Sequence, residues 1–207
     1  MSIKDAYNLW AFQYDTNDNK TRDLESIALR STLKNISFNN CLEVGCGTGK
    51  NTAWLVEKAE HVTAVDFSEE MLRKAKEKVV SDRVEFIQAD INMPWLFGNK
   101  LYDVATFSLV LEHILDLNHI FSEAYKLLQP GGYLYLGELH PFKQYAGSKA
   151  RFDTGIETKI LECYNHHISD FIHAATDKFV VKIFDEYFDD DDKNAIPRIL
   201  TILFQKQ

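Results

Sequence analysis

The chain has 207 residues, of which 45% are hydrophobic and 26% are charged, and its formal net charge at pH 7 is -8. This size and composition predict a single globular domain with a core large enough to need neither disulfides nor a structural metal. The acidic balance, without a dense cluster of lysine and arginine, argues against nucleic acid as a substrate, and no apolar stretch has the length of a membrane span.

Short apolar runs alternate with helical patterns from residue 41 to about residue 139. Predicted strands cover residues 41–45, 61–65, 84–88, 104–107 and 132–138, and predicted helices cover residues 48–58, 69–79 and 118–128. The alternation predicts a parallel sheet that is covered by helices on both faces. Pro130 and the glycines after it mark the end of the last helix and the turn into the next strand.

Beyond residue 178 the pattern changes to two β-prone runs. They cover residues 179–184 and 199–204, and an acidic segment separates them. Two such runs suit an antiparallel hairpin that closes the sheet. With the five strands before them, they predict a sheet of seven strands.

The first predicted strand runs into three glycines at alternate positions, Gly45, Gly47 and Gly49. Glycine tolerates positive φ and lets a ligand approach main-chain atoms without a Cβ in the way. From Thr48 the pattern becomes helical, so the loop ends at a helix N-terminus, whose free N–H groups favour an anionic group. The pattern indicates a loop that holds a cofactor.

The second predicted strand ends at Asp66, and a carboxylate at the tip of the neighbouring strand can accept two ribose hydroxyls. Dinucleotide sites use a G-x-G-x-x-G loop in which the third glycine allows close packing of helix and strand. Here Lys50 takes the place of that third glycine. The spacing therefore argues against NAD or FAD and against nicotinamide-dependent reduction.

The loop and the strand ends together resemble the class I S-adenosylmethionine-dependent methyltransferases. The resemblance is closest to the small-molecule branch (methyltransferase type 11) typified by ubiquinone and menaquinone biosynthesis methyltransferases. Five ordered motifs carry it: Glu43 with the three glycines, and residues 65–72, 86–91, 102–108 and 128–134. The resemblance implies an α/β, Rossmann-like fold with a doubly wound, seven-stranded, mostly parallel sheet and an antiparallel last strand.

The resemblance also implies an activity, the transfer of a methyl group from S-adenosylmethionine to an O, N or C atom of a small metabolite, with S-adenosylhomocysteine as the product. Asp66 would take the ribose hydroxyls, and Phe67 with Met71 would flank the adenine. Asp90 would bind the adenine amino group, and the backbone of Ile91 the ring nitrogen. The glycines of the loop would surround the methionine and ribose portions.

Further expected cofactor residues follow from the same resemblance. Glu43 would order the loop or contact the cofactor, and Ser108 would meet the methionine portion through its backbone. Tyr14 or Arg22 could reach the cofactor carboxylate. Cys46 belongs to the cofactor loop, where a small residue that fills a tight space is the better interpretation than a nucleophile. The expected cofactor-binding set is Tyr14, Arg22, Glu43, Gly45, Cys46, Gly47, Gly49, Asp66, Phe67, Met71, Asp90, Ile91 and Ser108.

The candidate for catalysis is His140, directly after the fifth strand. A hydroxyl acceptor would benefit from a general base, and a histidine titrates near neutral pH. The alternative is that His140 only orders the turn before Pro141, and His113 is a weaker candidate. The three cysteines, Cys41, Cys46 and Cys163, show no metal-ligand spacing, so no metal is expected.

We expect one methyltransferase domain in four parts: an N-terminal cap segment to about residue 40, the cofactor core to about residue 139, a substrate-side insertion to about residue 178, and the closing hairpin. Aromatic residues in the cap and the insertion suit either an acceptor pocket or core packing. We expect a cytoplasmic monomer or homodimer with a small-molecule acceptor. The alternatives are a protein or tRNA methyltransferase, with RNA disfavoured by the charge, and a non-catalytic module that binds the donor or its product.

Overall fold

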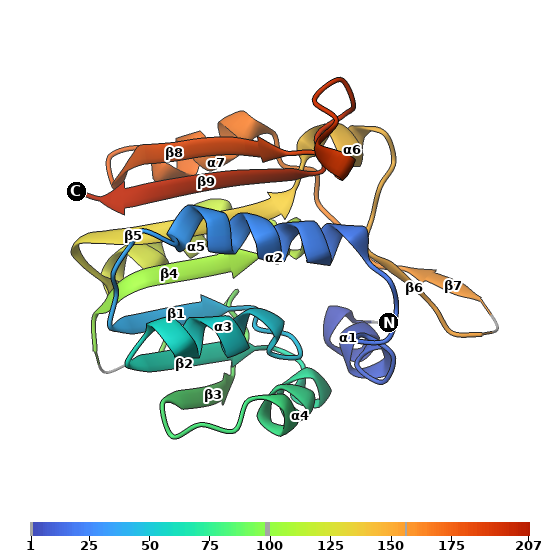
Figure 1. The fold of residues 1–207 in the computed structure, drawn as a ribbon, viewed down its shortest axis with the longest axis horizontal. Helices are drawn as coiled ribbons and strands as arrows, with labels where there is room; N and C mark the ends of the chain where they lie inside the picture. The colour runs from blue at the N-terminus through green and yellow to red at the C-terminus, as the bar shows by residue number, and fades with distance from the viewer. Residues whose placement is uncertain (1, 98–99, 156) are drawn as a thin grey trace.

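The computed structural model describes residues 2–97, 100–155 and 157–207, and a seven-stranded sheet in the order β3-β2-β1-β4-β5-β9-β8 lies at its centre (Figure 1). The first five strands pair in parallel, whereas β9 is antiparallel to both of its neighbours, β5 and β8. The predicted doubly wound sheet with an antiparallel last strand is confirmed. The strands are β1 (Asn40–Val44), β2 (His61–Asp66), β3 (Val84–Gln88), β4 (Tyr102–Ser108), β5 (Leu128–Leu139), β8 (Phe179–Tyr187) and β9 (Ile199–Lys206).

Helices cover both faces of this sheet (Figure 1). One core cluster joins α2, α3 and α4 to one face, and another joins α5 and α7 to the opposite face. Within the residues that the structure describes, no helix has the length and hydrophobicity that a membrane crossing requires. The helices are α1 (Ile3–Trp10), α2 (Lys20–Leu33), α3 (Lys50–Lys58), α4 (Glu69–Lys78), α5 (Leu117–Leu127), α6 (Pro141–Tyr145) and α7 (Ile168–Ala175), with short 3-10 turns η1 (Leu111–His113) and η2 (Asp189–Asp191).

The central strands are apolar on both sides because both faces of the sheet are covered. Side chains alternate between the faces of a strand. Accordingly Cys41 packs with α2 and α3, and the next residue, Leu42, packs with α5. In β4, Val104 likewise belongs to the cluster with α2 and α3, and Ala105 belongs to the cluster with α5. Burial on both faces is the reason that these strands read as continuous apolar runs in the sequence.

Several element boundaries differ from the sequence-based expectation, among them the starts of β5 and α3. β5 begins at Leu128 instead of residue 132, because Leu128 already pairs with Tyr102 before the register shifts. The helix after the glycine loop begins at Lys50, and Gly49 precedes it in the left-handed conformation with φ 79°. The glycine loop therefore extends to Gly49.

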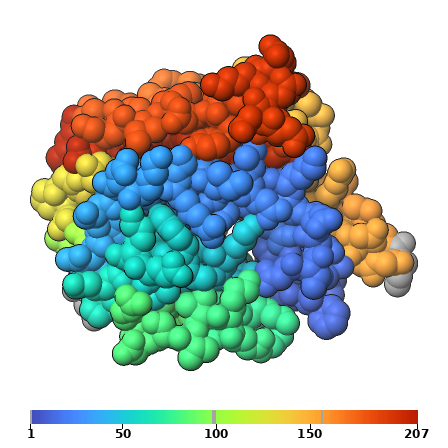
Figure 2. All heavy atoms as spheres, in the orientation of Figure 1, coloured from blue at the N-terminus to red at the C-terminus, as the bar shows by residue number. Residues whose placement is uncertain are grey.

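The N-terminal segment lies between the core and a small hairpin made of β6 (Arg151–Asp153) and β7 (Thr158–Ile160) (Figures 1 and 2). The Trp10 ring stacks on Phe152 with centroids 5.2 Å apart, and a third cluster also contains Met71 of α4. Gln13 donates a hydrogen bond to the Asp153 carbonyl. These contacts hold α1 over the carboxyl ends of the parallel strands.

Candidate active site

Three adjoining pockets lie where the strand order reverses between β1 and β4, the usual ligand position in open α/β sheets. Tyr14 and Leu109 line all three of them. The central pocket is lined by Tyr7, Gly47, Asp66, Phe67, Asp90, Ile91, Asn92, Ser108 and His113, with their neighbours. The inner pocket is lined by Arg22, Glu25, Glu43, Cys46, Thr48, Lys50 and Asn51, and the outer pocket by Tyr7, Trp10, Lys20, Arg22, Glu112, Leu139, Lys149 and Arg151.

The glycine loop separates the central pocket from the inner one. Gly45 and Gly47 have φ of 76° and 54°, the left-handed region that favours glycine. A Cβ added to Gly45 would lie 2.1 Å from a methyl carbon of Val110, whereas one added to Gly47 would meet no protein atom within 4 Å. Because Gly47 also lines both pockets, it keeps open a space that a ligand can occupy.

Asp66 joins the end of β2 to the glycine loop. One carboxylate oxygen accepts the Gly47 N–H at 2.8 Å, and the other accepts the Ser68 N–H at 2.8 Å. Burial raises the pKa of Asp66 above its ordinary value, against these hydrogen bonds. Each carboxylate oxygen has a further lone pair, and Asp66 lines the central pocket, so it can still accept ligand hydroxyls.

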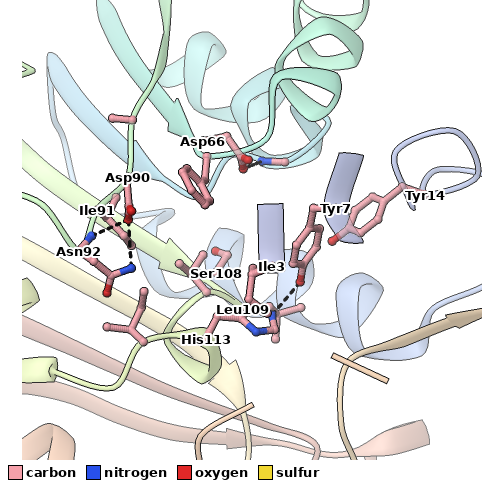
Figure 3. Close-up of a pocket in the computed structure, with 16 residues that line it drawn as sticks. Ile3, Tyr7, Tyr14, Asp66, Asp90, Ile91, Asn92, Ser108, Leu109 and His113 are labelled. Carbon is pink, nitrogen blue, oxygen red and sulfur yellow. Dashed lines mark hydrogen bonds between the residues drawn. The ribbon is translucent and has the colours of Figure 1, made fainter. Parts of the chain in front are cut away.

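The far side of the central pocket comes from the loop after β3 (Figure 3). One oxygen of Asp90 accepts the backbone N–H and the side-chain amide of Asn92, at 2.9 and 3.0 Å. Ile91 and Phe67 add apolar surface, and the Phe67 side chain is partly exposed. A flat aromatic ligand would find apolar contacts here together with a carboxylate at its edge.

The inner pocket contains two buried acids. Glu25 accepts the Ser108 hydroxyl at 2.6 Å and the Asn51 amide at 2.9 Å. Glu43 accepts the Thr52 hydroxyl at 2.5 Å. Burial is the main cause that raises the pKa of Glu25 to about 7 and that of Glu43 to about 8. A cationic group in this pocket would favour their ionised forms.

Arg22 reaches the inner and outer pockets from the start of α2. Its guanidinium lies 4.1 Å from the Tyr14 ring centroid and donates to the Tyr14 and Asn17 carbonyls. Its Nε is buried and has no hydrogen-bond partner. A buried donor without a partner costs free energy, so this atom suits a ligand oxygen such as that of a carboxylate.

Tyr7 and His113 meet on the wall of the central pocket (Figure 3). The Tyr7 hydroxyl lies 2.8 Å from Nε2 of His113, and Nδ1 of His113 lies 2.9 Å from the Glu162 carbonyl. Because a carbonyl only accepts, Nδ1 carries the proton in the neutral ring, and Nε2 accepts from the hydroxyl. Burial raises the pKa of Tyr7 well above its ordinary value, so the hydroxyl is protonated at neutral pH.

The position of His140 argues against its expected role as the base. His140 is fully buried and lines none of the three pockets. Its Nδ1 accepts the Phe142 N–H at 3.1 Å as the N-cap of α6, and its Nε2 lies 2.9 Å from Glu186 Oε1. Both ring nitrogens are engaged, so the structure supports the alternative in which His140 orders the turn before Pro141.

Met71 also lies elsewhere than expected. Its side chain is 1% exposed and packs with Ala6 and Trp10 beneath α1, away from the lining of the central pocket. Phe67 lines that pocket without Met71.

Gly49 and Cys46 belong to the glycine loop. Gly49 is the N-cap of α3. Cys46 lines the inner pocket as a small buried residue, and burial raises the pKa of its thiol, which argues against a nucleophile.

Among the residues described, one group of three side chains could converge on a metal ion. The ligand atoms of Glu112, His113 and Cys163 lie within 4.8 Å of one another. The His113 nitrogens already contact Tyr7 and a carbonyl, and burial raises the pKa of the Cys163 thiol to about 12. The expectation that this protein uses no metal ion stays a prediction.

A family profile described as a methyltransferase domain matches residues 42–136. Residues 42–136 belong to the methyltransferase domain family. This methyltransferase domain is similar to the demethylmenaquinone methyltransferase of Clavibacter sepedonicus, with 31% identity over 54% of this chain and 46% of the relative. It is also similar to the malonyl-[acyl-carrier protein] O-methyltransferase of Priestia megaterium, with 29% identity over 79% of this chain and 56% of the relative.

The chain spans about half the length of these relatives, 46% of one and 56% of the other. Among solved structures, a complex of DhpI with S-adenosylhomocysteine superposes with a TM-score of 0.74. That match is 20% identical and covers 98% of this chain and 94% of the other. At this identity the match establishes the shared fold of the methyltransferase domain.

The main residues that sequence reasoning missed are Tyr7, Glu25 and Asn92 of the pocket walls. Tyr7 and Glu25 come from the N-terminal segment, where only the density of aromatic residues gave a signal. By sequence His113 is the weaker of the two histidine candidates. Nothing in the local pattern around either histidine reveals which of them lines the central pocket.

Proposed function

We propose that this chain transfers a methyl group from S-adenosylmethionine to a small molecule. In this proposal the donor occupies the central and inner pockets, and the acceptor occupies the outer pocket. The observation that carries it is the position of Tyr14 and Leu109, which line all three pockets. A donor in the central and inner pockets and an acceptor in the outer pocket would meet beside these two residues.

The residues of the central pocket fit the nucleoside part of the donor. Asp66 has free lone pairs for the ribose hydroxyls, and its position is set by two backbone N–H groups. Asp90 has one carboxylate oxygen beyond the one that Asn92 occupies, which suits the adenine amino group. Ile91 and Phe67 would pack on the base.

The inner pocket fits the amino-acid end of the donor. Its two buried acids, Glu25 and Glu43, suit the ammonium group, and the unpartnered Nε of Arg22 suits the carboxylate. Gly47 leaves room where the chain of the donor would pass. These features support the cofactor roles expected for Tyr14, Arg22, Glu43, Gly45 and Gly47.

When bound, S-adenosylmethionine supplies a methyl group that is activated by a sulfonium. The protein then has to align the acceptor, exclude water and remove a proton where the acceptor carries one. Nε2 of His113 accepts the hydrogen bond of the Tyr7 hydroxyl, so it can take that proton through this hydroxyl, which lines the outer pocket. The Glu162 carbonyl holds the ring in this tautomer.

The name of the first relative supports a small acceptor, since it is named for demethylmenaquinone, whereas the second is named for a malonyl group carried on a protein. Calorimetry with S-adenosylhomocysteine tests the donor site, and NADH serves as the negative control. We expect binding of the first and none of the second. Transfer of a labelled methyl group to any of a panel of small acceptors then separates an enzyme from a non-catalytic binding module. No saturable binding of S-adenosylhomocysteine would refute the proposal.

A further inference from the structure

The outer pocket is basic, although the chain as a whole is acidic. Four cationic residues line it, Lys20, Arg22, Lys149 and Arg151, against two acids. The net charge of the chain is -8. Within residues 2–97, 100–155 and 157–207, no carboxylate forms an ion pair with any of the four. Cations left without counter-ions around one hollow raise the local concentration of anions there.

The same pocket contains buried polar atoms that have no partner. In the described part of the chain, five buried side-chain atoms lack a hydrogen bond, and three of them belong to residues that line the outer pocket. They are Nε1 of Trp10, Nε of Arg22 and Oε2 of Glu112. The Trp10 side chain is buried, at 5% exposure. Such atoms are costly unless a ligand or water satisfies them. Because Nε of Arg22 is assigned above to the methyl donor and Oε2 of Glu112 can only accept, Nε1 of Trp10 is the donor of this group that is left for an acceptor ligand.

The two ends of the outer pocket differ in chemistry. Its inner end is formed by Tyr7, Tyr14 and Leu109, which it shares with the central pocket. Its mouth is marked by the exposed lining residues, which are Asp18, Lys20, Ser148, Lys149 and Arg151. Trp10 and Leu139 add apolar wall. A ligand that fits this pocket has an apolar body, and its negative charge lies away from the reaction end.

We propose that the methyl acceptor is a small organic acid whose carboxylate is held at the mouth by Lys149 and Arg151. Its body occupies the outer pocket behind this mouth, and the atom to be methylated lies beside Tyr7. The anion is thus an anchor and not the methylated group. This inference rests on the proposed function, for which it names the substrate class. A basic mouth also disfavours a basic protein as the substrate.

Matched pairs of ligands test this charge preference. The probes are 4-hydroxyphenylacetate, indole-3-acetate and octanoate, each paired with its neutral amide. Their affinities for the protein loaded with S-adenosylhomocysteine are measured by calorimetry. We expect at least one acid to bind about tenfold or more tightly than its amide, because a charge-assisted hydrogen bond replaces a neutral one. If no acid exceeds its amide, the inference is wrong.

A pair of double variants locates the effect. Lys149→Gln with Arg151→Gln should bring the ratio of acid to amide affinity close to one. The control, Arg30→Gln with Lys182→Gln, removes the same two charges at exposed positions outside the pocket and should keep the wild-type ratio. An equal loss of preference in both variants would mean that overall charge, not the pocket, attracts the acid, and would overturn the assignment.

Binding of S-adenosylhomocysteine is measured first in every sample. If the wild type does not bind it, the proposed function fails and the inference fails with it. If it binds but acids and amides bind alike, only the substrate class is refuted. The Lys149→Gln and Arg151→Gln variant should bind S-adenosylhomocysteine as the wild type does, because neither side chain lines the central or inner pocket.

Discussion

The hydroxyl of Tyr7 lies 2.8 Å from Nε2 of His113, although the two residues are 106 positions apart in the chain. α1 brings the tyrosine over the sheet, and the 3-10 turn after β4 brings the histidine to the same wall of the central pocket. The pair therefore exists only when the N-terminal segment is docked. In the proposed reaction, docking of α1 both closes the acceptor pocket and places the Tyr7 hydroxyl against the base, His113.

Removal of the base should slow catalysis and spare donor binding. For His113→Asn we expect kcat to fall by about 10²- to 10⁴-fold, the usual contribution of a general base. The variant Tyr7→Phe keeps the ring and tests the proton path separately. Steady-state kinetics with calorimetry of S-adenosylhomocysteine checks both. Full activity of His113→Asn would remove this residue as the base.

His140→Ala should act on stability instead. The change removes the N-cap of α6 and leaves Glu186 without its partner, so we expect the free energy of unfolding to fall by about 1–3 kcal/mol. Denaturant titration measures the loss. The kcat of the folded fraction should match that of the wild type, and a hundredfold drop in kcat without loss of stability would restore His140 as a catalytic candidate.

Asp66→Ala should weaken binding of the donor by about 1–3 kcal/mol, because two ribose hydroxyls would lose a charged acceptor. It also frees the N–H groups of Gly47 and Ser68, so Asp66→Asn is the companion variant, which retains an acceptor for one of them. Calorimetry with S-adenosylhomocysteine gives the affinities. Unchanged affinity in both variants would contradict the assignment of Asp66.

Two glycines of the loop should respond differently to alanine. At Gly45 the new methyl would lie 2.1 Å from Val110, so Gly45→Ala should destabilise the fold by several times the ~1 kcal/mol cost of positive φ alone. At Gly47 the new methyl meets no protein atom within 4 Å, so the stability loss should stay near ~1 kcal/mol while donor binding is lost. Thermal unfolding and calorimetry separate the two outcomes, and intact donor binding by Gly47→Ala would refute this role of the loop.

Stability should fall with rising pH because of the buried acids. Burial raises the pKa of Glu43 from 4.5 to about 8 and that of Glu25 to about 7. Between the ordinary and the raised pKa the folded protein keeps protons that the unfolded chain releases, so these groups lower the unfolding free energy as pH rises through this window. In Glu43→Gln the decline between pH 5 and pH 8 should be smaller than in the wild type. Denaturant titrations across this range test it, and identical slopes would contradict the assignment.

Much of the fold was predictable because the signals for it are local. Strands covered on both faces read as short apolar runs, so β1 to β4 were located within a few residues. The start of β5 is not predictable from its local pattern, because Leu128 pairs with Tyr102 ahead of Pro130 and the register then shifts. The hairpin of β6 and β7 was missed, since three-residue strands leave no periodicity.

The sequence by itself determined the α/β architecture, the glycine loop and the carboxylate of Asp66, because these follow from the order of residues along one strand–loop–helix unit. Only the tertiary structure decided that His113 and not His140 lines the central pocket, and that Tyr7 contacts His113. It also decided that Lys149 and Arg151 both line the outer pocket. Those relationships join segments far apart in the chain. They depend on how α1 and the segment after β5 pack over the sheet, which local patterns do not encode.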